Sequence, residues 1–332
     1  MKKTHYSSIV VGLGVLLCLA FVVSVTLGRF PITLRQLLNA LFFARSEVSD
    51  QLKAILFNVR LPRILLSCMV GCSLSAAGAS YQGVFQNPMA APDILGASSG
   101  AATGAALAIL LELPGQMVML FAFVFSLGTI ALVMLVSRFA RGEKLLGIIL
   151  AGIMISSLTG AVTSYIKLVA DPNNILPEIT YWLMGSLAKT MPRDVIFAAV
   201  PMAIGLIPLV FLRWRINLLT LSDNEARTMG VNVGAVRFTV IVCATLITAA
   251  SVSVSGLIGW VGLVVPHLLR RLVGNNYRHL LPASMIGGAL FLLIVDDISR
   301  NLLITEIPIG ILTSVVGAPF FLWLITRKKE VA

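Results

Sequence analysis

Residues 113–137 read LPGQMVMLFAFVFSLGTIALVMLVS, a run of 25 residues without a charged side chain or a histidine. Glu112 precedes this run and Arg138 follows it. A helix needs about 20 mostly apolar residues to cross the hydrocarbon core of a bilayer. The run therefore predicts a transmembrane helix with a charged residue at each end.

Eight more runs of this kind surround it. The run that begins at Phe238 is too long for one span and carries Gly256 and Gly259 near its middle. It is expected to form one helix to about Ser255, a tight turn, and a second helix at 261–272. That gives ten transmembrane helices, of which the ninth, at 280–295, is short. The eight runs cover residues 6–28, 64–92, 94–111, 145–166, 195–212, 238–266, 280–295 and 307–326.

The whole chain has the composition of a membrane protein. Of its 332 residues 58% are hydrophobic and only 12% are charged, and the mean hydropathy is +0.97. A soluble domain has roughly 25% charged residues, so a water-soluble enzyme is nearly excluded. The net charge of +11 would suit a nucleic-acid partner, but the charges flank the apolar runs. We therefore expect the chain to contact membrane lipid and not nucleic acid. The predicted fold class is all-α: a polytopic membrane helix bundle forming a single transmembrane domain over 1–332.

The basic residues predict the orientation of the bundle. Ten spans place both termini on one side. With that side inside, 15 of the 25 lysine and arginine residues fall in inner segments and 10 in outer segments, while the 14 acidic residues divide as five inner and nine outer. Because basic segments are retained in the cytoplasm during insertion, both termini are predicted to be cytoplasmic. A nine-span chain would put Arg327, Lys328 and Lys329 outside, against this bias.

The first apolar run is expected to remain in the protein as a helix. Lys2 and Lys3 followed by an apolar run also fit a cleaved signal peptide. However, the run exceeds 20 residues, and no clear small-x-small cleavage site precedes Arg29.

The spans lack the groups that would mark an enzyme or an ion-coupled carrier. No Asp, Glu, Lys or Arg lies near the middle of a span, where such carriers usually keep an ionisable residue. His267, Asp296 and Asp297 lie near span ends, and Cys68 and Cys72 have no further Cys or His ligand beside them. Neither a GxxxxGK[ST] phosphate loop nor an HExxH zinc motif occurs. We therefore predict no catalytic residue, no metal site and no cofactor.

Small residues recur every four positions in four of the spans, which is typical of helices that pack closely in lipid. This spacing predicts a compact multi-helix body. The four stripes are Gly96, Gly100 and Gly104; Gly71, Ser75, Ala79 and Gly83; Gly152, Ser156, Gly160 and Ser164; and Gly310, Ser314 and Ala318.

Three strings of polar or turn-forming residues interrupt the apolar pattern. The first, Arg60-Leu61-Pro62-Arg63, stands at the outer mouth of the second span. Proline at an early helix position costs little, because its missing N–H would be unpaired there anyway. The two arginines would then face outward, either snorkelling at the membrane interface or forming a docking site for an acidic partner.

The second string reads QGVFQNPMAAPDILGASSGA at 82–101 and joins the second and third spans on the inner side. Pro88 and Pro92 prevent a continuous helix. Irregular backbone at membrane depth is tolerated only where it is buried in protein or lines a wet cavity. This segment is therefore a candidate inner gate.

The third string lies in the longest inner connection, at about 213–237. Ser222 is a natural N-cap with Glu225 at N3, which is a capping box, and Gly230 suits the position after a helix end. The short helix is either a simple connector or a contact for a cytoplasmic partner. Its exposed charged residues would be Asp223, Glu225 and Arg227.

Taken in order, these strings resemble the permease subunits of the FecCD/vitamin-B12 type, which belong to bacterial ABC importers for iron–siderophore complexes, haem and cobalamin. No single string is decisive, but the ordered set, which extends from Arg60 to Phe321, is specific. The matching segments are 60–63, 86–92 with 95–101, 181–186, 221–230, 262–267, 296–300, and 306–310 with 317–321.

The resemblance implies an assembly in the bacterial cytoplasmic membrane. Two permease subunits, identical or paralogous, would surround a central pathway, with cytoplasmic ATPase subunits and an extracytoplasmic substrate-binding protein. Asn87 and Met89 match the inner gate loop, with Met89 where leucine is common. Arg60, Arg63 and Arg300 would form the outer basic patch that receives glutamates of the binding protein. The ATPase coupling helix would contain Ser222, Asp223, Glu225, Arg227 and Gly230, with Asp223 where glycine is frequent.

The predicted function is that of a permease rather than an enzyme. It would carry an iron–siderophore complex along the subunit interface, lined by the second, fifth and neighbouring helices, with ATP hydrolysed by the partner subunit. Haem or cobalamin is the alternative cargo for the same importer type. An ion-gradient-driven secondary transporter is the runner-up class, disfavoured by the absence of ionisable residues at mid-span.

Overall fold

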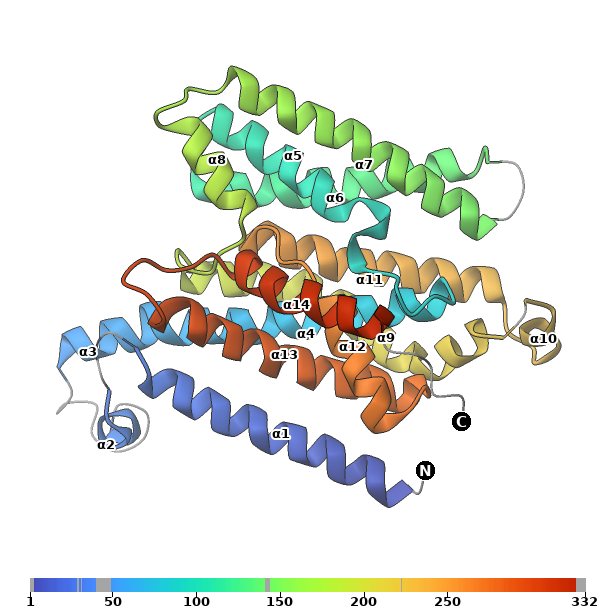
Figure 1. Ribbon diagram of the computed structural model, residues 1–332, viewed down its shortest axis with the longest axis horizontal. Coiled ribbons are helices and arrows are strands. Elements are labelled where there is room, and N and C mark those ends of the chain that lie inside the picture. The colour runs from blue at the N-terminus through green and yellow to red at the C-terminus, as the bar shows by residue number, and fades with distance from the viewer. Residues whose placement is uncertain are drawn as a thin grey trace.

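The computed structural model describes residues 3–28, 30, 32–39, 49–140, 144–221 and 223–326, with the backbone alone at 3–5, 34, 38, 144, 223, 224, 227, 324 and 325. The described residues form helices joined by short connections and contain no β-strand (Figure 1). This confirms the predicted all-α class.

The helices follow one another along the chain with few long connections. The bounds are α1 Lys3–Thr26, α2 Leu34–Leu38, α3 Asp50–Ile55, α4 Leu61–Val84, α5 Ala97–Leu110, α6 Gly115–Ser137, α7 Lys144–Val169, α8 Ile175–Leu183, α9 Pro192–Leu219, α10 Asp223–Thr228, α11 Val233–Ser255, α12 Val261–Val273, α13 Tyr277–Asn301 and α14 Ile309–Thr326.

Among the described residues, seven helical segments are long and apolar enough to cross a membrane. They are α1, the continuous rod Asp50–Val84, α6, α7, α9, α11 and α13. Two shorter apolar helices, α5 and α14, lie where the third and tenth spans are expected, and α12 lies where the eighth is expected. The count of ten spans stays a prediction. The start of α1 and the end of α14 lie at the same end of the bundle, with α10, while α3 and α8 lie at the other (Figure 1). From the charge distribution we name these the predicted cytoplasmic end and the predicted external end.

The ninth span is longer than expected. α13 has 25 residues, whereas the charge-free run at 280–295 predicts a short helix. The helix continues through charged residues at both ends, because a charged side chain is tolerated where it has a partner. Asp296 is fully buried and lies 2.9 Å from the guanidinium of Arg63. The short helices at expected span positions are instead α5 and α12, of 14 and 13 residues.

Pro62 is the second residue of α4, as expected, but α4 continues a longer helical rod and does not begin it. The rod Asp50–Val84 has 35 residues, and a π-helical turn at Leu56–Arg60 comes directly before α4. Proline removes one hydrogen bond of an α-helix, and a local π-helical turn is one way in which the freed backbone groups of a membrane helix find partners. Arg60 and Arg63 therefore lie within the rod, which corrects the expectation that they stand at its mouth.

Two helices form the centre of the bundle. In the most apolar window, 78% of the residues are buried in the rod that contains α4 and 72% in α11, against 11% in α1 and 22% in α7. Figure 1 shows α7 and α1 at opposite edges, with α4 and α11 between them. The second span therefore offers little free surface for a pathway, whereas the fifth span offers a broad one.

The small-residue stripes lie mostly where helices approach closely. A Cβ on Gly71 would lie 2.2 Å from the Gly288 carbonyl oxygen of α13, and a Cβ on Gly104 would lie 2.4 Å from the Phe121 carbonyl oxygen of α6. The stripe on α7 divides: a Cβ on Gly152 would lie 2.5 Å from the Ile94 oxygen, but nothing lies within 4 Å of Gly160. Compact packing is confirmed for the first two stripes, and the outer half of the α7 stripe is open.

The tight turn expected after Ser255 is present. α11 ends at Ser255 and α12 begins at Val261, with Gly256 at φ +67°. A Cβ on Gly256 would lie 2.3 Å from the carbonyl oxygen of Trp182. Glycine is therefore required here both by the left-handed backbone and by the close approach of the α8 end.

Candidate functional site

Arg63 is buried between two carboxylates at the predicted external end. Its Nε and Nη2 donate to Asp296 of α13 at 3.0 and 2.9 Å. Its Nη1 donates to the two oxygens of Glu306, in the α13–α14 connection, at 3.0 and 2.9 Å. The side chain of Arg63 is 8% exposed and that of Asp296 is not exposed at all. One guanidinium thus joins α4, α13 and the segment before α14.

Arg60 and Arg300 hold the end of α1. Arg60 donates to the carbonyl of Val25 at 2.8 Å and to that of Phe30. Arg300 donates to the Ser24 carbonyl and hydroxyl oxygens, each at 2.6 Å, and it also pairs with Asp297. The last carbonyls of a helix lack intrahelical partners and form its negative end. Both arginines therefore stabilise the C-terminus of α1 against α4 and α13.

The three arginines do not form an open basic patch, so the expected outward orientation is wrong. Arg60, Arg63 and Arg300 are 6%, 6% and 7% exposed. The acidic partners were not identified by sequence reasoning, which treated them as external charges. The pair Asp297–Arg300 has a readable i,i+3 spacing, but the Arg63 partners lie more than 230 residues away along the chain.

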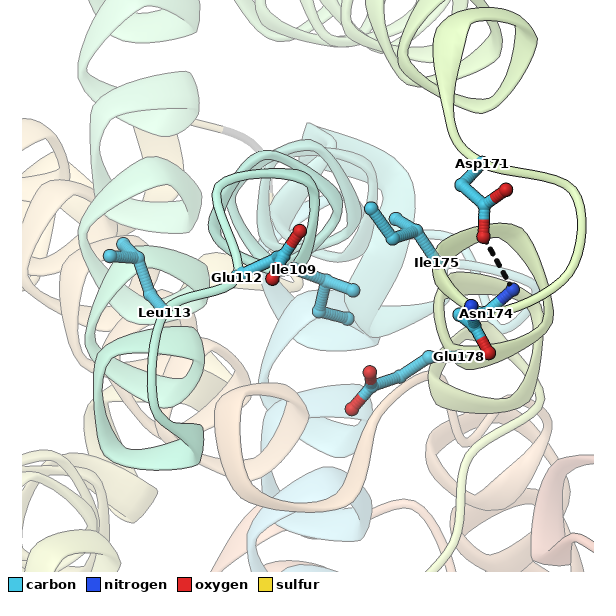
Figure 2. Close-up of a pocket in the computed structure, with 7 residues that line it drawn as sticks. All are labelled: Ile109, Glu112, Leu113, Asp171, Asn174, Ile175 and Glu178. Atoms are coloured by element: carbon cyan, nitrogen blue, oxygen red, sulfur yellow. Dashed lines mark hydrogen bonds between the residues drawn. The ribbon is translucent and has the colours of Figure 1, made fainter.

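Two cavities adjoin α8 at the predicted external end. The larger, of about 510 Å³, carries three carboxylates, from Glu112, Asp171 and Glu178. Figure 2 shows Ile109 between Glu112 and Glu178, and the Asp171 carboxylate accepts the N–H of Asn174 at 2.8 Å. Among the described residues no group of three or more His, Cys, Asp or Glu is arranged to hold a metal ion. The cavity is an acidic recess without the geometry of a metal site.

The second cavity, of about 340 Å³, lies between α6, α8, α9 and the end of α11 and shares Glu178 with the first. It combines aromatic and basic side chains, including Trp182 and Lys189. Arg193 at its rim lies 3.8 Å from Asp194 and has a 55% exposed side chain. Among the described residues at this end, Lys189 and Arg193 beside α8 and α9 are exposed, as is Arg35 of α2, whereas Arg60, Arg63 and Arg300 are buried.

Asn87 and Met89, the expected inner gate residues, lie in the connection between α4 and α5 at the predicted cytoplasmic end. Both are exposed. The Asn87 side-chain oxygen accepts the Met89 N–H at 2.9 Å, and the Ala90 N–H bonds to the Asn87 carbonyl at 3.1 Å. Ala90 is 1% exposed. The two residues therefore form a compact turn, anchored at Ala90, whose tip is free in the single chain.

The expected coupling segment is shorter than 213–237. α9 continues to Leu219 and α11 begins at Val233, so Arg213, Arg215 and Arg237 lie on helices. A short helix, α10, occupies Asp223–Thr228.

The predicted end of α10 is confirmed by Gly230, which is at φ +76°. Ser222 lies outside the described residues, as do the side chains of Asp223 and Arg227, so the capping box stays a prediction. Glu225 is exposed. Ala226 is fully buried and attaches α10 to the bundle.

A polar cluster ties four helices together near these two segments. Arg270 of α12 donates to the side-chain oxygen of Gln82 at 2.7 Å and to the Tyr277 hydroxyl at 2.9 Å. Asn217 of α9 accepts the Tyr277 N–H at 2.8 Å and donates to Asn276 at 3.0 Å. The ends of α4, α9, α12 and α13 are thus joined by hydrogen bonds at the predicted cytoplasmic end.

Comparison with known proteins identifies a family. The model of the FecCD transport family matches residues 16–327. The molybdate import system permease protein MolB of Haemophilus influenzae is 39% identical over 332 residues, covering 99% of this chain and 98% of that protein. A probable iron chelatin transport system permease protein of Helicobacter pylori is 39% identical over 289 residues and 87% of each chain. A solved inward-facing structure of a proposed metal-chelate type ABC transporter matches with a TM-score of 0.87 and 38% identity, covering 96% of this chain and 99% of that one.

Proposed function

The chain belongs to the FecCD transport family and is the permease subunit of an ABC importer, and from that premise we propose that it carries an iron–siderophore complex across the cytoplasmic membrane. The observation that supports this most is the match over almost the whole chain, together with the similarity to a metal-chelate type transporter. The placement of charge agrees with an externally powered conduit. The buried arginines and aspartates among the described residues cluster toward the ends of the bundle, and none forms the mid-membrane centre of an ion-coupled carrier.

The energy would come from ATPase subunits that contact the predicted cytoplasmic end. The proposed contact is the coupling segment 222–230, with Ser222, Asp223, Glu225, Arg227 and Gly230. The support is its position, since α10 is a short helix attached to the bundle through buried Ala226 and followed by Gly230 in a left-handed conformation. The inner gate would be the turn of Asn87 and Met89, which lies at the same end.

An extracytoplasmic binding protein would deliver the substrate at the predicted external end. Arg60, Arg63 and Arg300 all have partners inside the chain, so they could bind carboxylates of the binding protein only after releasing those partners. Exposed charge pairs chiefly orient an approaching partner. We therefore propose that first contact involves the exposed Lys189 and Arg193 beside α8, while the buried arginines set the shape of this face.

The second candidate cargo is molybdate. It is favoured by the 39% identity to a molybdate import permease over the full chain length, which equals the identity to the iron chelatin permease over a shorter range. Haem and cobalamin stay alternatives of the same importer type.

A transport assay with the complete importer tests the proposal. The tagged chain is purified with its associated subunits, reconstituted with the binding protein, and offered ⁵⁵Fe-siderophores, ⁹⁹Mo-molybdate, haem or radiolabelled cobalamin. We expect ATP-dependent uptake of a ferric siderophore that is insensitive to a protonophore. Selective uptake of one of the others would replace the proposed cargo, and uptake by the chain alone on a proton or sodium gradient would contradict the ABC mechanism.

A further inference from the structure

The side chain of Gln86 connects the turn that holds Asn87 and Met89 to the end of α9. Its Nε2 donates to the Leu219 carbonyl at 2.8 Å and to the Leu221 carbonyl at 3.1 Å. Leu219 is the last residue of α9, and Leu221 immediately precedes the proposed coupling segment 222–230. One side chain therefore links the turn that contains Asn87 to Leu221, the residue before the proposed coupling segment.

Because both partners are carbonyl oxygens, this contact requires a side chain that donates hydrogen bonds. The last carbonyls of a helix have no intrahelical partner and lie at its negative end. A carboxamide offers two N–H donors on one nitrogen, so Gln86 can serve both carbonyls at once. A carboxylate of the same size would offer no donor and would place negative charge at the negative end of α9.

The backbone of Gln86 is unfavourable for a residue with a side chain. Its φ is +50°, a left-handed conformation that glycine adopts more readily than any other residue. The residue is exposed, so burial of its side chain does not compensate for this strain. The hydrogen bonds to Leu219 and Leu221 are the interactions that glycine could not make.

Close packing surrounds this connection. A Cβ on Gly83 would lie 2.5 Å from Cγ2 of Ile216, so α4 and α9 are in direct contact one turn before Gln86. The Gln86 N–H bonds to the Gly83 carbonyl at 3.4 Å, and the Asn87 N–H bonds to the Gln82 carbonyl at 3.2 Å. The start of the turn is thus fixed to α4, and its side chain is fixed to α9.

We propose that Gln86 is the positioning residue that transmits displacement of the coupling segment to the inner gate. Movement of the carbonyls of Leu219 and Leu221 would pull on the Gln86 carboxamide and rotate the turn of Asn87 and Met89. This inference rests on the proposed function, because it requires an ATPase that moves the coupling segment. If its role were purely static, Gln86 would only stabilise the local structure, as Asn217 does by accepting the Tyr277 N–H at the start of α13.

The test measures the gate response in the complete importer in lipid nanodiscs. Met89→Cys is introduced as a reporter in a chain whose four native cysteines are replaced, and its reaction rate with a maleimide is followed without nucleotide and with ATP and vanadate. ATP hydrolysis is measured in the same samples. The variants are Gln86→Glu, which removes the donors, Gln86→Gly, which removes the side chain and relaxes the backbone, and Gln86→Arg, which keeps donors. Gln51→Glu on α3, an exposed position at the predicted external end, is the matched control.

The quantity compared is the change in labelling rate that ATP and vanadate cause, divided by the rate of ATP hydrolysis. We expect this quantity to fall about tenfold in Gln86→Glu and Gln86→Gly, a size typical of energetic coupling between two sites. Gln86→Arg and Gln51→Glu should keep it. A response in Gln86→Glu or Gln86→Gly equal to that of the parent would overturn the role of Gln86 and leave the proposed function intact. No response in the parent itself would overturn the proposed function. If Gln86→Glu does not assemble, Gln86→Met removes the donors without adding charge and decides the question.

Discussion

The guanidinium of Arg63 is held between Asp296 and Glu306 in an environment that lets in little water. Breaking such a pair costs more than the pair contributes, because the partner left behind is a buried charge without compensation. The cost of breaking a pair should fall as the acidic side chain becomes more exposed. Asp296 is not exposed, Glu306 is 29% exposed, and Asp50, which pairs with Lys53, is 100% exposed.

Asp296→Asn is therefore expected to lower the free energy of unfolding by about 3–5 kcal/mol. Glu306→Gln should have a smaller effect of the same sign, and Asp50→Asn should leave stability unchanged. Equilibrium unfolding of the three variants in mixed detergent and SDS micelles measures the order. Equal stability of Asp296→Asn and the parent would show that the Arg63 pair does not hold this end together.

At the scale of residues, the sequence points to candidate residues but not to the groups that they contact. The arginines were identified by resemblance, but their partners were not, since the Arg63 partners come from the other end of the chain. Gln86 lay inside the predicted gate string without a role of its own. Its partners are backbone carbonyls of α9, and a backbone acceptor leaves no mark in the sequence.

Among the helices, the order of the apolar segments along the chain follows from the sequence, but the helix lengths do not. A charge-free run ends at the first ionisable residue, whereas a helix ends where its hydrogen bonds or packing end. α13 passes through Asp296 because Arg63 is there to pair with it. α3 could not be foreseen as part of the second rod, because its charged residues lie outside the apolar run.

The glycine stripes determine how closely these helices approach. Gly71 of α4 and Gly288 of α13 face each other, and a Cβ on either would lie 2.2 Å from the other's carbonyl oxygen. Both contacts are with backbone, which cannot turn aside as a side chain can. In the membrane, where helices gain little from the hydrophobic effect, such close approach is a main source of association.

Gly71→Ala is expected to destabilise the bundle by about 1–3 kcal/mol through overpacking. The matched control is Gly128→Ala on α6, where nothing lies within 4 Å of the added Cβ, and its effect should stay within about 1 kcal/mol. Thermal unfolding followed by tryptophan fluorescence in detergent compares the two. A midpoint for Gly71→Ala at or above that of Gly128→Ala would mean that α4 and α13 can separate without loss.

At the scale of the molecule, small residues on two helices, α7 and α14, are exposed on the single chain. On α7 the outer half of the stripe is exposed, with Gly160 and Ser164 beside apolar Leu168, which is 80% exposed. On α14, Ser314 and Ala318 are exposed beside Val315. Small residues suit helix–helix contacts better than contacts with lipid. This favours the proposal that a second permease subunit, identical or paralogous, covers these faces.

Gly160→Phe tests that assembly against a matched change on another exposed helix. At Gly12 of α1, as at Gly160, nothing lies within 4 Å of an added Cβ, so Gly12→Phe adds the same ring to a surface expected to face lipid. We expect the native mass of the importer purified through the tagged chain to show two permease subunits for the parent and for Gly12→Phe. Gly160→Phe should lose the second subunit, because a phenyl ring prevents close approach of two backbones at that point. Retention of two permease subunits in Gly160→Phe would place the interface elsewhere, and the open face of α7 would then be a lipid contact.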